Sequence, residues 1–427
     1  MQNNYKKYFK IYLLTILTFA IIWLYLKHSV GNDSTISEWI INYQGGFTRR
    51  GLPGELAFQI AKFFDFKLRV VILFFQVTFY SLYLFLIYRF FKDIKLNAVI
   101  LFAIFTPIFL LYHIAELEVL VRKEIFLFLG YLWFYNISNE KDDIKKTIFW
   151  ILFILPIISI LYEPSVFYYS FFAAIAIIKM RNLSLLKILI ITSLLFIPSI
   201  IVSWMSATIS ITDQGFLLMK NSLLDNFNEA CYRSCDVMNS MRDPSVHLNQ
   251  TFTKLNEGEY TVYSYLFRYL MIILIGFAPL FLIIKNTTLS FPIFNFKGFV
   301  FPFIIVNLTV PVHWLMFIDW GRAVNIAYVS ALLFFFHLYK NKLIKVNFPN
   351  INKKITKVTN FFMKNISLKS KKKFFVFVFI IYAFGWSPPT LLSADVNSFP
   401  GYRIPYKTIK FLSLNHLGYN IFYFYKN

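Results

Sequence analysis

The chain contains 427 residues, of which 58% are hydrophobic and only 15% are charged. Soluble domains have roughly 45–50% apolar and about 25% charged residues. The composition therefore excludes an ordinary soluble enzyme, a disordered chain, a collagen and a coiled coil, and it indicates a helical membrane protein. Two cysteines are too few for a disulfide scaffold. The net charge of +22 has to be interpreted by its position relative to the bilayer.

Apolar segments recur along the whole chain. About 20 apolar residues cross a hydrocarbon core that is roughly 30 Å thick. We therefore expect a single all-α transmembrane domain over residues 1–427, with about eleven spans, at 9–26, 70–88, 97–112, 125–137, 147–162, 164–178, 188–210, 262–284, 298–318, 323–339 and 374–391. No small-residue cleavage site follows the first span, so we expect a retained signal anchor rather than a cleaved signal peptide.

Positive charge is concentrated on one side of this layout. With the N-terminus inside, the inside segments hold 25 of the 43 basic residues but only 4 of the 21 acidic residues, as the positive-inside rule requires. The lysine-rich segment 340–373 is then a cytoplasmic loop against anionic lipid, and we do not expect nucleic-acid binding there. An odd number of spans places the tail 392–427 outside.

Arginine follows a different distribution from lysine. Nine of the eleven arginines lie outside, where orientation does not need them: Arg49, Arg50, Arg69, Arg122, Arg233, Arg242, Arg268, Arg322 and Arg403. The planar guanidinium grips phosphate and carboxylate groups through paired hydrogen bonds. These arginines either hold an anionic substrate or pair with the outside acids.

The outside segment 28–69 carries an arginine pair in a glycine-rich turn. Four glycines bracket Arg49 and Arg50, and Leu52–Phe66 is expected to form a short amphipathic element that begins near Pro53. Glycine lets backbone N–H groups approach an anion, and a helix N-terminus attracts phosphate. The turn is either a diphosphate cradle or an interfacial turn with arginines that reach the headgroups.

Three more outside segments carry ionisable groups at span ends. Six ionisable side chains lie within His113–Glu124, where they face a cavity or form a solvated loop. Glu163 precedes the helix-breaking Pro164 at a span boundary. Asp319 and Arg322 stand three residues apart, either as a structural ion pair or as a general base and an anion clamp beside an aromatic platform.

The longest outside segment is 211–261, and loops of that length are usually functional or disordered. It contains Cys231 and Cys235, which form either a small disulfide loop or two free thiols. The six histidines have no metal-ligand spacing, and the motifs of nucleotide, dinucleotide and zinc enzymes are absent from the sequence.

Two short motifs carry a resemblance. Tyr43–Gly54 (YQGGFTRRGLPG) and Asp319–Arg322 (DWGR) resemble motifs of membrane proteins that build bacterial surface polysaccharides. The layout is also similar to the O-antigen repeat-unit polymerase (Wzy-like) family. The resemblance implies an integral glycosyltransferase of the GT-C type in the bacterial inner membrane, which joins undecaprenyl-diphosphate-linked oligosaccharides at the periplasmic face.

The chemistry of such a reaction assigns expected roles. Arginines neutralise the leaving diphosphate, a carboxylate or histidine takes the proton of the acceptor hydroxyl, and aromatic or loop residues hold glycan. The expected diphosphate ligands are Arg49, Arg50, Arg122 and Arg322, the candidate bases are Asp319, Glu163, Glu55 and His313, and the glycan contacts are Trp320, Arg233, Arg242 and His247. We expect no metal or cofactor; the expected partners are the lipid-linked oligosaccharide, membrane lipid and a chain-length regulator protein.

Other functions remain open on sequence alone. An O-antigen ligase or another polyprenyl-phosphate-dependent transferase would use the same chemistry with a different acceptor. A flippase for the lipid-linked repeat unit would predict an even number of spans and internal repeats, and no repeat is visible. A structural or assembly protein would make the outside arginines redundant.

Overall fold

The computed structural model describes residues 2–30, 34–139, 143–209, 211–236, 238, 244–256, 262–293, 296–362 and 368–390. The protein is mostly helical (75%), and by helix length and hydropathy it is a multi-pass membrane protein. Within the described residues, six helical runs are long and apolar enough to cross a membrane: α1 (Gln2–Val30), α4 (Leu68–Phe91), α8–η2–α9 (Ile144–Leu161), α11 (Leu185–Thr208), α15 (Val262–Lys285) and α18 (Trp320–Lys340).

Shorter elements complete the bundle. The shorter helices that pack among these runs are α5 (Ala98–Ile104), α6 (Tyr112–Ala115), η1 (Leu117–Val119), α7 (Ile125–Ile137), η3 (Glu163–Tyr168), α10 (Tyr169–Lys179), α16 (Val300–Asn307), α17 (Val310–Met316) and α20 (Leu368–Phe384). The more polar helices are α2 (Ser34–Ser37), α3 (Leu52–Phe63), α12 (Asp213–Phe227), α14 (Pro244–Asn256) and α19 (Phe348–Phe362).

Most expected spans correspond to apolar helices, but those at 164–178 and 97–112 do not. The six long runs confirm the spans expected at 9–26, 70–88, 147–162, 188–210, 262–284 and 323–339, and shorter apolar helices occupy 125–137, 298–318 and part of 374–391. The span expected at 164–178 is a 3-10 turn followed by the eleven-residue α10.

The span expected at 97–112 is wrong as a single helix. The helix α5 ends at Ile104, and turns follow up to α6. Pro107 disfavours helical geometry at Thr106 before it. The side chain of Asn325 on α18 donates to the carbonyl oxygens of Ile108 and Phe109 at 2.9 and 3.1 Å. These bonds satisfy backbone groups that an unbroken helix would have paired.

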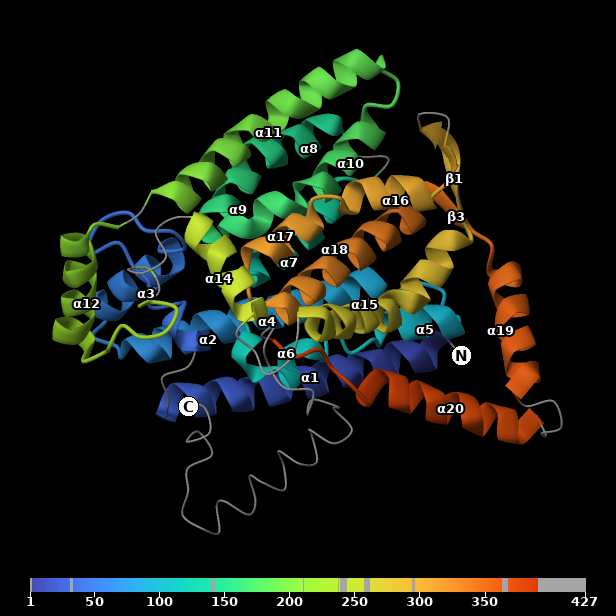
Figure 1. Cartoon of the computed structure of the whole chain (residues 1–427), viewed down its shortest axis with the longest axis horizontal. Helices are drawn as coiled ribbons and strands as arrows, with labels where there is room; N and C mark the ends of the chain where they lie inside the picture. The colour runs from blue at the N-terminus through green and yellow to red at the C-terminus, as the bar shows by residue number, and fades with distance from the viewer. Residues whose placement is uncertain are drawn as a thin grey trace, which may run out of the picture.

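The helix α18 forms the centre of the bundle, and Figure 1 shows it crossing the middle of the molecule. All of its residues from Trp320 to Leu338 are buried. It contacts α7, α10, α15 and α17. A helix that is buried on every side is surrounded by other helices rather than by lipid, so residues at its first turn lie inside the protein although they begin a membrane span.

The two ends of the bundle are different. Figure 1 shows α2, α3 and α12 at one end, called here the cluster end, and β1, β3 and α19 at the opposite end, called the sheet end, where the N-terminus also lies. The helix α1 starts at the sheet end and runs to the cluster end. The amphipathic element expected over Leu52–Phe66 is confirmed as α3, with a proline in its first turn.

The expectation of an all-α fold needs correction at the sheet end. The strands β1 (Thr287–Ile293), β2 (Phe296–Gly298) and β3 (Ile344–Val346) form an antiparallel sheet in the order β2-β1-β3, with Thr288 opposite both Gly298 and Lys345. The strands are short, and β3 begins 51 residues after the end of β1, so no local sequence pattern predicts the sheet.

Two expected loops contain regular structure. The segment 340–373 is not a plain loop, because it contains β3, α19 and the start of α20. The segment 211–261 contains α12 and α14. The tail 392–427 lies outside the described residues.

Candidate functional site

Five separate segments bring charged side chains together at the cluster end. They are the residue after α2, the glycine-arginine turn before α3, the segment between η1 and α7, the start of η3 and the start of α18. We call the group the charge cluster; it consists of Glu38, Arg49, Arg50, Arg122, Lys123, Glu124, Glu163, Asp319 and Arg322.

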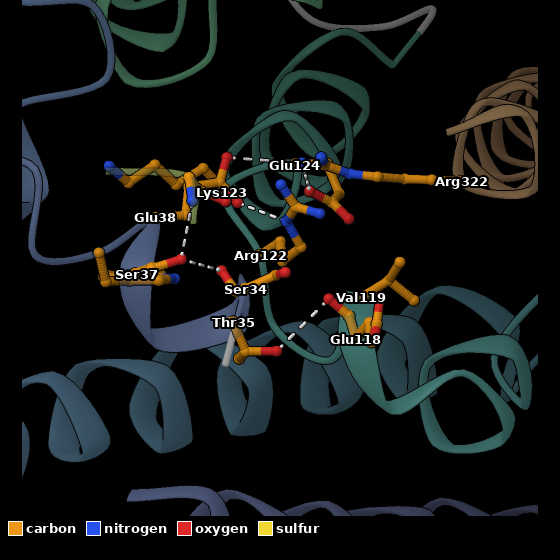
Figure 2. A network of polar contacts seen from close by, with 12 residues as sticks. Ser34, Thr35, Ser37, Glu38, Glu118, Val119, Arg122, Lys123, Glu124 and Arg322 are labelled. Carbon is orange, nitrogen blue, oxygen red and sulfur yellow. Dashed lines mark hydrogen bonds and ion pairs between the residues drawn. The ribbon is translucent and has the colours of Figure 1, made fainter. Parts of the chain in front are cut away.

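Glu38 is the centre of the cluster. Its side chain is fully buried, and its carboxylate lies 2.6 Å from Nε of Arg122, 3.0 Å from NH1 of Arg50 and 3.6 Å from NH2 of Arg322. Figure 2 shows Glu38, Arg122 and Arg322 reaching this point from three different parts of the chain. One carboxylate therefore holds three guanidinium groups within a few ångströms of each other.

Arg50 is fixed on both its side chain and its backbone. Nε and NH2 donate to the Glu163 carboxylate at 2.6–3.0 Å in a forked pair, which is the strong geometry of arginine and carboxylate. Its backbone is left-handed, with φ at 60°, a conformation that costs energy for a residue with a Cβ. Lys123 donates to the Arg50 carbonyl oxygen, so a buried contact holds this turn in place.

Arg322 enters the cluster from the first turn of α18. It donates to Glu124, and NH1 lies 3.6 Å from Asp319. Gly321 allows this helix start, because a Cβ there would lie 1.8 Å from the carbonyl oxygen of Pro389. The glycine of the Asp-Trp-Gly-Arg motif is thus required by close packing of the segment after α20.

An aromatic ring separates two of the arginines. The guanidinium carbons of Arg50 and Arg322 lie 5.5 and 5.7 Å from the ring centroid of Tyr162. Both distances fall within the range of cation–π attraction. The buried ring of Tyr162 therefore stabilises two like charges that would otherwise repel each other.

Four arginines face four carboxylates in the cluster, so Lys123 is a fifth cation without a counter-charge of its own. Burial alone would raise the pKa of the Glu38 carboxyl, but Arg122, Arg322 and Arg50 outweigh burial and hold that pKa well below its usual range. Burial lowers the pKa of Lys123 to about 7. Its charge therefore changes close to neutral pH.

Asp319 is the most accessible carboxylate of the cluster. Its side chain is 22% exposed, and its contacts to Arg122 and Arg322 are long, at 3.4 and 3.6 Å. By contrast, Glu163 is buried in the forked pair with Arg50. An incoming anion can take the place of Asp319 between the two arginines, and the released carboxylate can then accept a proton.

Unpaired atoms lie next to this position. Oε1 of Glu124 and Nε of Arg322 are buried and have no hydrogen-bond partner within the described part of the chain. Buried polar atoms are normally bonded to protein or ordered water. One acceptor and one donor are thus available to a polar group that enters beside Arg322.

Two further candidate bases, Glu55 and His313, form hydrogen bonds outside the charge cluster. Glu55 accepts from the backbone N–H of Tyr43 and from Gln44 and Gln59, so it stabilises the turn before α3. His313 is buried and hydrogen-bonded to the Tyr168 hydroxyl at 2.8 Å.

Of the expected glycan contacts, the structure describes the side chains of Trp320 and Arg233. Trp320 donates to the carbonyl oxygen of Trp314. Arg233 lies 3.4 Å from the Ser34 hydroxyl and 3.9 Å from Glu118. Arg242 and the side chain of His247 lie outside the described residues.

Two arginines away from the cluster have an acid or an aromatic ring as partner. Arg69 makes a forked pair with Glu229 at 2.6–2.7 Å, and Arg268 lies 5.3 Å over the ring of Tyr265. Within the described residues, no group of three or more His, Cys, Asp or Glu side chains is arranged to hold a metal ion.

The two cysteines form a disulfide in the structure, with an S–S distance of 2.06 Å between Cys231 and Cys235. The free-thiol alternative is therefore not what the structure shows. The enclosed turn is anchored on α2, since the backbone N–H of Ser234 donates to the Ser37 hydroxyl at 3.2 Å. Ser37 directly precedes Glu38, so the disulfide turn braces the segment that carries the centre of the cluster.

Sequence reasoning missed the partners of the arginines. Glu38, Lys123, Glu124 and Tyr162 were not among the expected site residues. The available signal was the balance of charge outside, where acidic residues nearly equal basic ones in number. No family model matches this chain, and no curated protein or solved structure is significantly similar to it.

Proposed function

We propose that the protein is a polyprenyl-diphosphate-dependent glycosyltransferase that joins lipid-linked oligosaccharide repeat units, as an O-antigen type polymerase does. The single observation that carries the proposal is that the two resembling motifs, about 270 residues apart in sequence, meet in one buried cluster. Arg50 of the first motif and Arg322 of the second share both Glu38 and the ring of Tyr162.

The proposed chemistry uses the cluster without a nucleotide. A lipid diphosphate binds between Arg122 and Arg322 in place of Asp319 and is the leaving group of the donor sugar. The acceptor hydroxyl oxygen attacks the anomeric carbon, the bond from that carbon to the diphosphate oxygen breaks, and the hydroxyl proton passes to Asp319. The arginines compensate the charge that develops on the diphosphate.

The proposed location is the bacterial inner membrane, with the cluster end in the periplasm. The N-terminal lysines and the lysine-rich segments around α19 lie towards the sheet end, and positive charge favours the cytoplasm. The disulfide at the cluster end suits an oxidising compartment. The N-terminus would then be cytoplasmic and the C-terminus periplasmic.

Deletion of the gene in its native host tests the proposal. Gel analysis of surface lipopolysaccharide should show loss of the long ladder while a single repeat unit is retained. Absence of any repeat unit would instead favour a flippase or an earlier transferase. A single repeat that fails to reach the lipid core would favour a ligase.

Complementation with variants tests the site. Arg50→Gln and Arg322→Gln should abolish the ladder, whereas Arg69→Gln, which breaks an ion pair of the same kind away from the cluster, should preserve it. Asp319→Asn serves as a second variant, because its contacts are long and its loss leaves the buried ion pairs intact. A full ladder from Asp319→Asn would remove Asp319 as the base.

A further inference from the structure

Two apolar grooves flank α15. The first has a volume of about 640 Å³ and lies between α15 and the pair α16–α17, over α18; apart from Asn307 and Lys285 its lining is apolar. The second has a volume of about 620 Å³ and lies between α15, α5 and α20, with one residue from α19. Both volumes are within the range of about 300–1,000 Å³ that is usual for ligand sites.

The first groove approaches the start of α18, the helix turn that carries Arg322. Trp314 lines its end, and the carbonyl oxygen of Trp314 accepts a 2.8 Å hydrogen bond from Trp320, two residues before Arg322. On the other wall, Tyr269 lies one helical turn before the lining residue Ile273, and its ring centroid is 5.3 Å from that of Trp320. Trp314 and Tyr269 thus both contact Trp320, in the helix turn from which Arg322 enters the cluster.

The length of the groove favours a lipid with a longer chain than the acyl chains of a phospholipid. Its lining runs along α15 from Ile273 to Lys285, which at 1.5 Å per residue is roughly 18 Å. One leaflet is half of a hydrocarbon core that is about 30 Å thick. The groove is therefore longer than one leaflet, so the acyl chains of a phospholipid, which occupy one leaflet each, would leave part of it unfilled.

We propose that this groove holds the hydrocarbon chain of a polyisoprenoid lipid whose diphosphate lies at the charge cluster. The inference rests on the proposed function for the identity of the headgroup, and it adds where the chain lies. The apolar lining desolvates the chain, while Trp314 and Trp320 mark the change from hydrocarbon to charge. The second groove is the matched comparison, because it has similar volume and an equally apolar lining on an adjacent face of α15, where Leu274, Ala278 and Leu282 line both grooves.

Photo-cross-linking tests the placement directly. The probe is undecaprenyl diphosphate with a diazirine near the end of its chain, added to the full-length protein in lipid nanodiscs. We expect labelled peptides from α15 and α16–α17. Because α15 lines both grooves, the α16–α17 peptides decide the result: labelling of α5 or α20 without α16–α17, or equal displacement of the probe by phosphatidylglycerol, would overturn the inference.

A pair of groove-filling variants tests it by affinity. Ile304 in the first groove is 44% exposed and Val378 in the second is 37% exposed, so a tryptophan at either position enters a groove without entering the core. Ile304→Trp should weaken binding of undecaprenyl diphosphate about tenfold, equivalent to about 1.4 kcal/mol, and Val378→Trp should leave it unchanged. Binding of inorganic pyrophosphate, which has no chain, should be the same in both variants.

The outcomes separate this inference from the proposed function. If the protein transfers sugar and the two tryptophan variants change lipid binding equally, the groove assignment is refuted and the transferase proposal stands. Selective loss of lipid binding in Ile304→Trp, in a protein that never transfers sugar, would support the groove and refute the transferase proposal.

Discussion

The buried carboxylate of Glu38 gives the sharpest test of how the charge cluster is held together. Glu38→Gln keeps the shape of the side chain but removes the negative charge that lies within 2.6–3.6 Å of three guanidinium groups. Removing one partner of a buried ion pair costs about 3–5 kcal/mol, because it leaves the remaining charge buried and unmatched. We expect a loss of that size in the free energy of unfolding.

The matched control is Glu229→Gln. Glu229 also makes a forked pair with an arginine, but Arg69 is 24% exposed, and water compensates its charge when the partner is removed. We therefore expect a smaller loss for Glu229→Gln than for Glu38→Gln, because partial exposure of the arginine lets solvent screen the charge that remains. Titration of both purified variants with SDS in mixed micelles, followed by tryptophan fluorescence and circular dichroism, measures the difference.

A loss below about 1 kcal/mol for Glu38→Gln would refute the reasoning. It would mean that water reaches the three arginines and that the cluster is not the buried network described here. A loss of equal size in both variants would show that burial does not distinguish the two sites.

Three further perturbations have expected outcomes. The pKa of Lys123 is lowered from 10.5 to about 7, so between these pH values the unfolded chain binds more protons than the folded protein. The free energy of unfolding should therefore rise with pH across that window. SDS titrations at about pH 7 and about pH 9 should show a smaller rise for Lys123→Met than for the wild type. Gly321→Ala should lower the free energy of unfolding by at least about 1–3 kcal/mol, because the alanine Cβ would meet the carbonyl oxygen of Pro389. The control is Gly298→Ala, whose Cβ would meet no atom within 4 Å and which should show no such loss in the same assay. Cys231→Ser, which removes the disulfide, should lower the thermal midpoint and, through the turn on α2, weaken pyrophosphate binding; unchanged binding would show that the turn does not brace the site.

Long apolar spans could be predicted because their signal is local. The segments that form α1, α4 and α15 are continuous apolar runs, and hydropathy alone finds them. The start of α18 was placed three residues late, at 323, because Arg322 looks like a loop residue. It is tolerated inside the helix because Glu124 and Glu38 compensate its charge, and that pairing is invisible in the sequence.

The arginines could be singled out from the sequence, but their surroundings could not. Arg50 and Arg322 could be identified because the orientation of the protein in the membrane does not require basic residues at these outside positions. Which acids they meet depends on contacts between residues as far apart as Glu38 and Arg122, separated by 84 positions. Glu163 was expected as a base, and the forked pair with Arg50 shows why a carboxylate in that position is better described as a partner of the arginine.

Binding of undecaprenyl diphosphate to the purified protein tests the central claim most directly. The account predicts saturable binding by the wild type and by Arg69→Gln, and a loss of at least about tenfold in Arg322→Gln, equivalent to about 1.4 kcal/mol. Because the arginines of the cluster are held by acids, the folded state of each variant is to be verified by circular dichroism. Wild-type affinity in a folded Arg322→Gln protein would contradict the claim that the cluster binds the diphosphate.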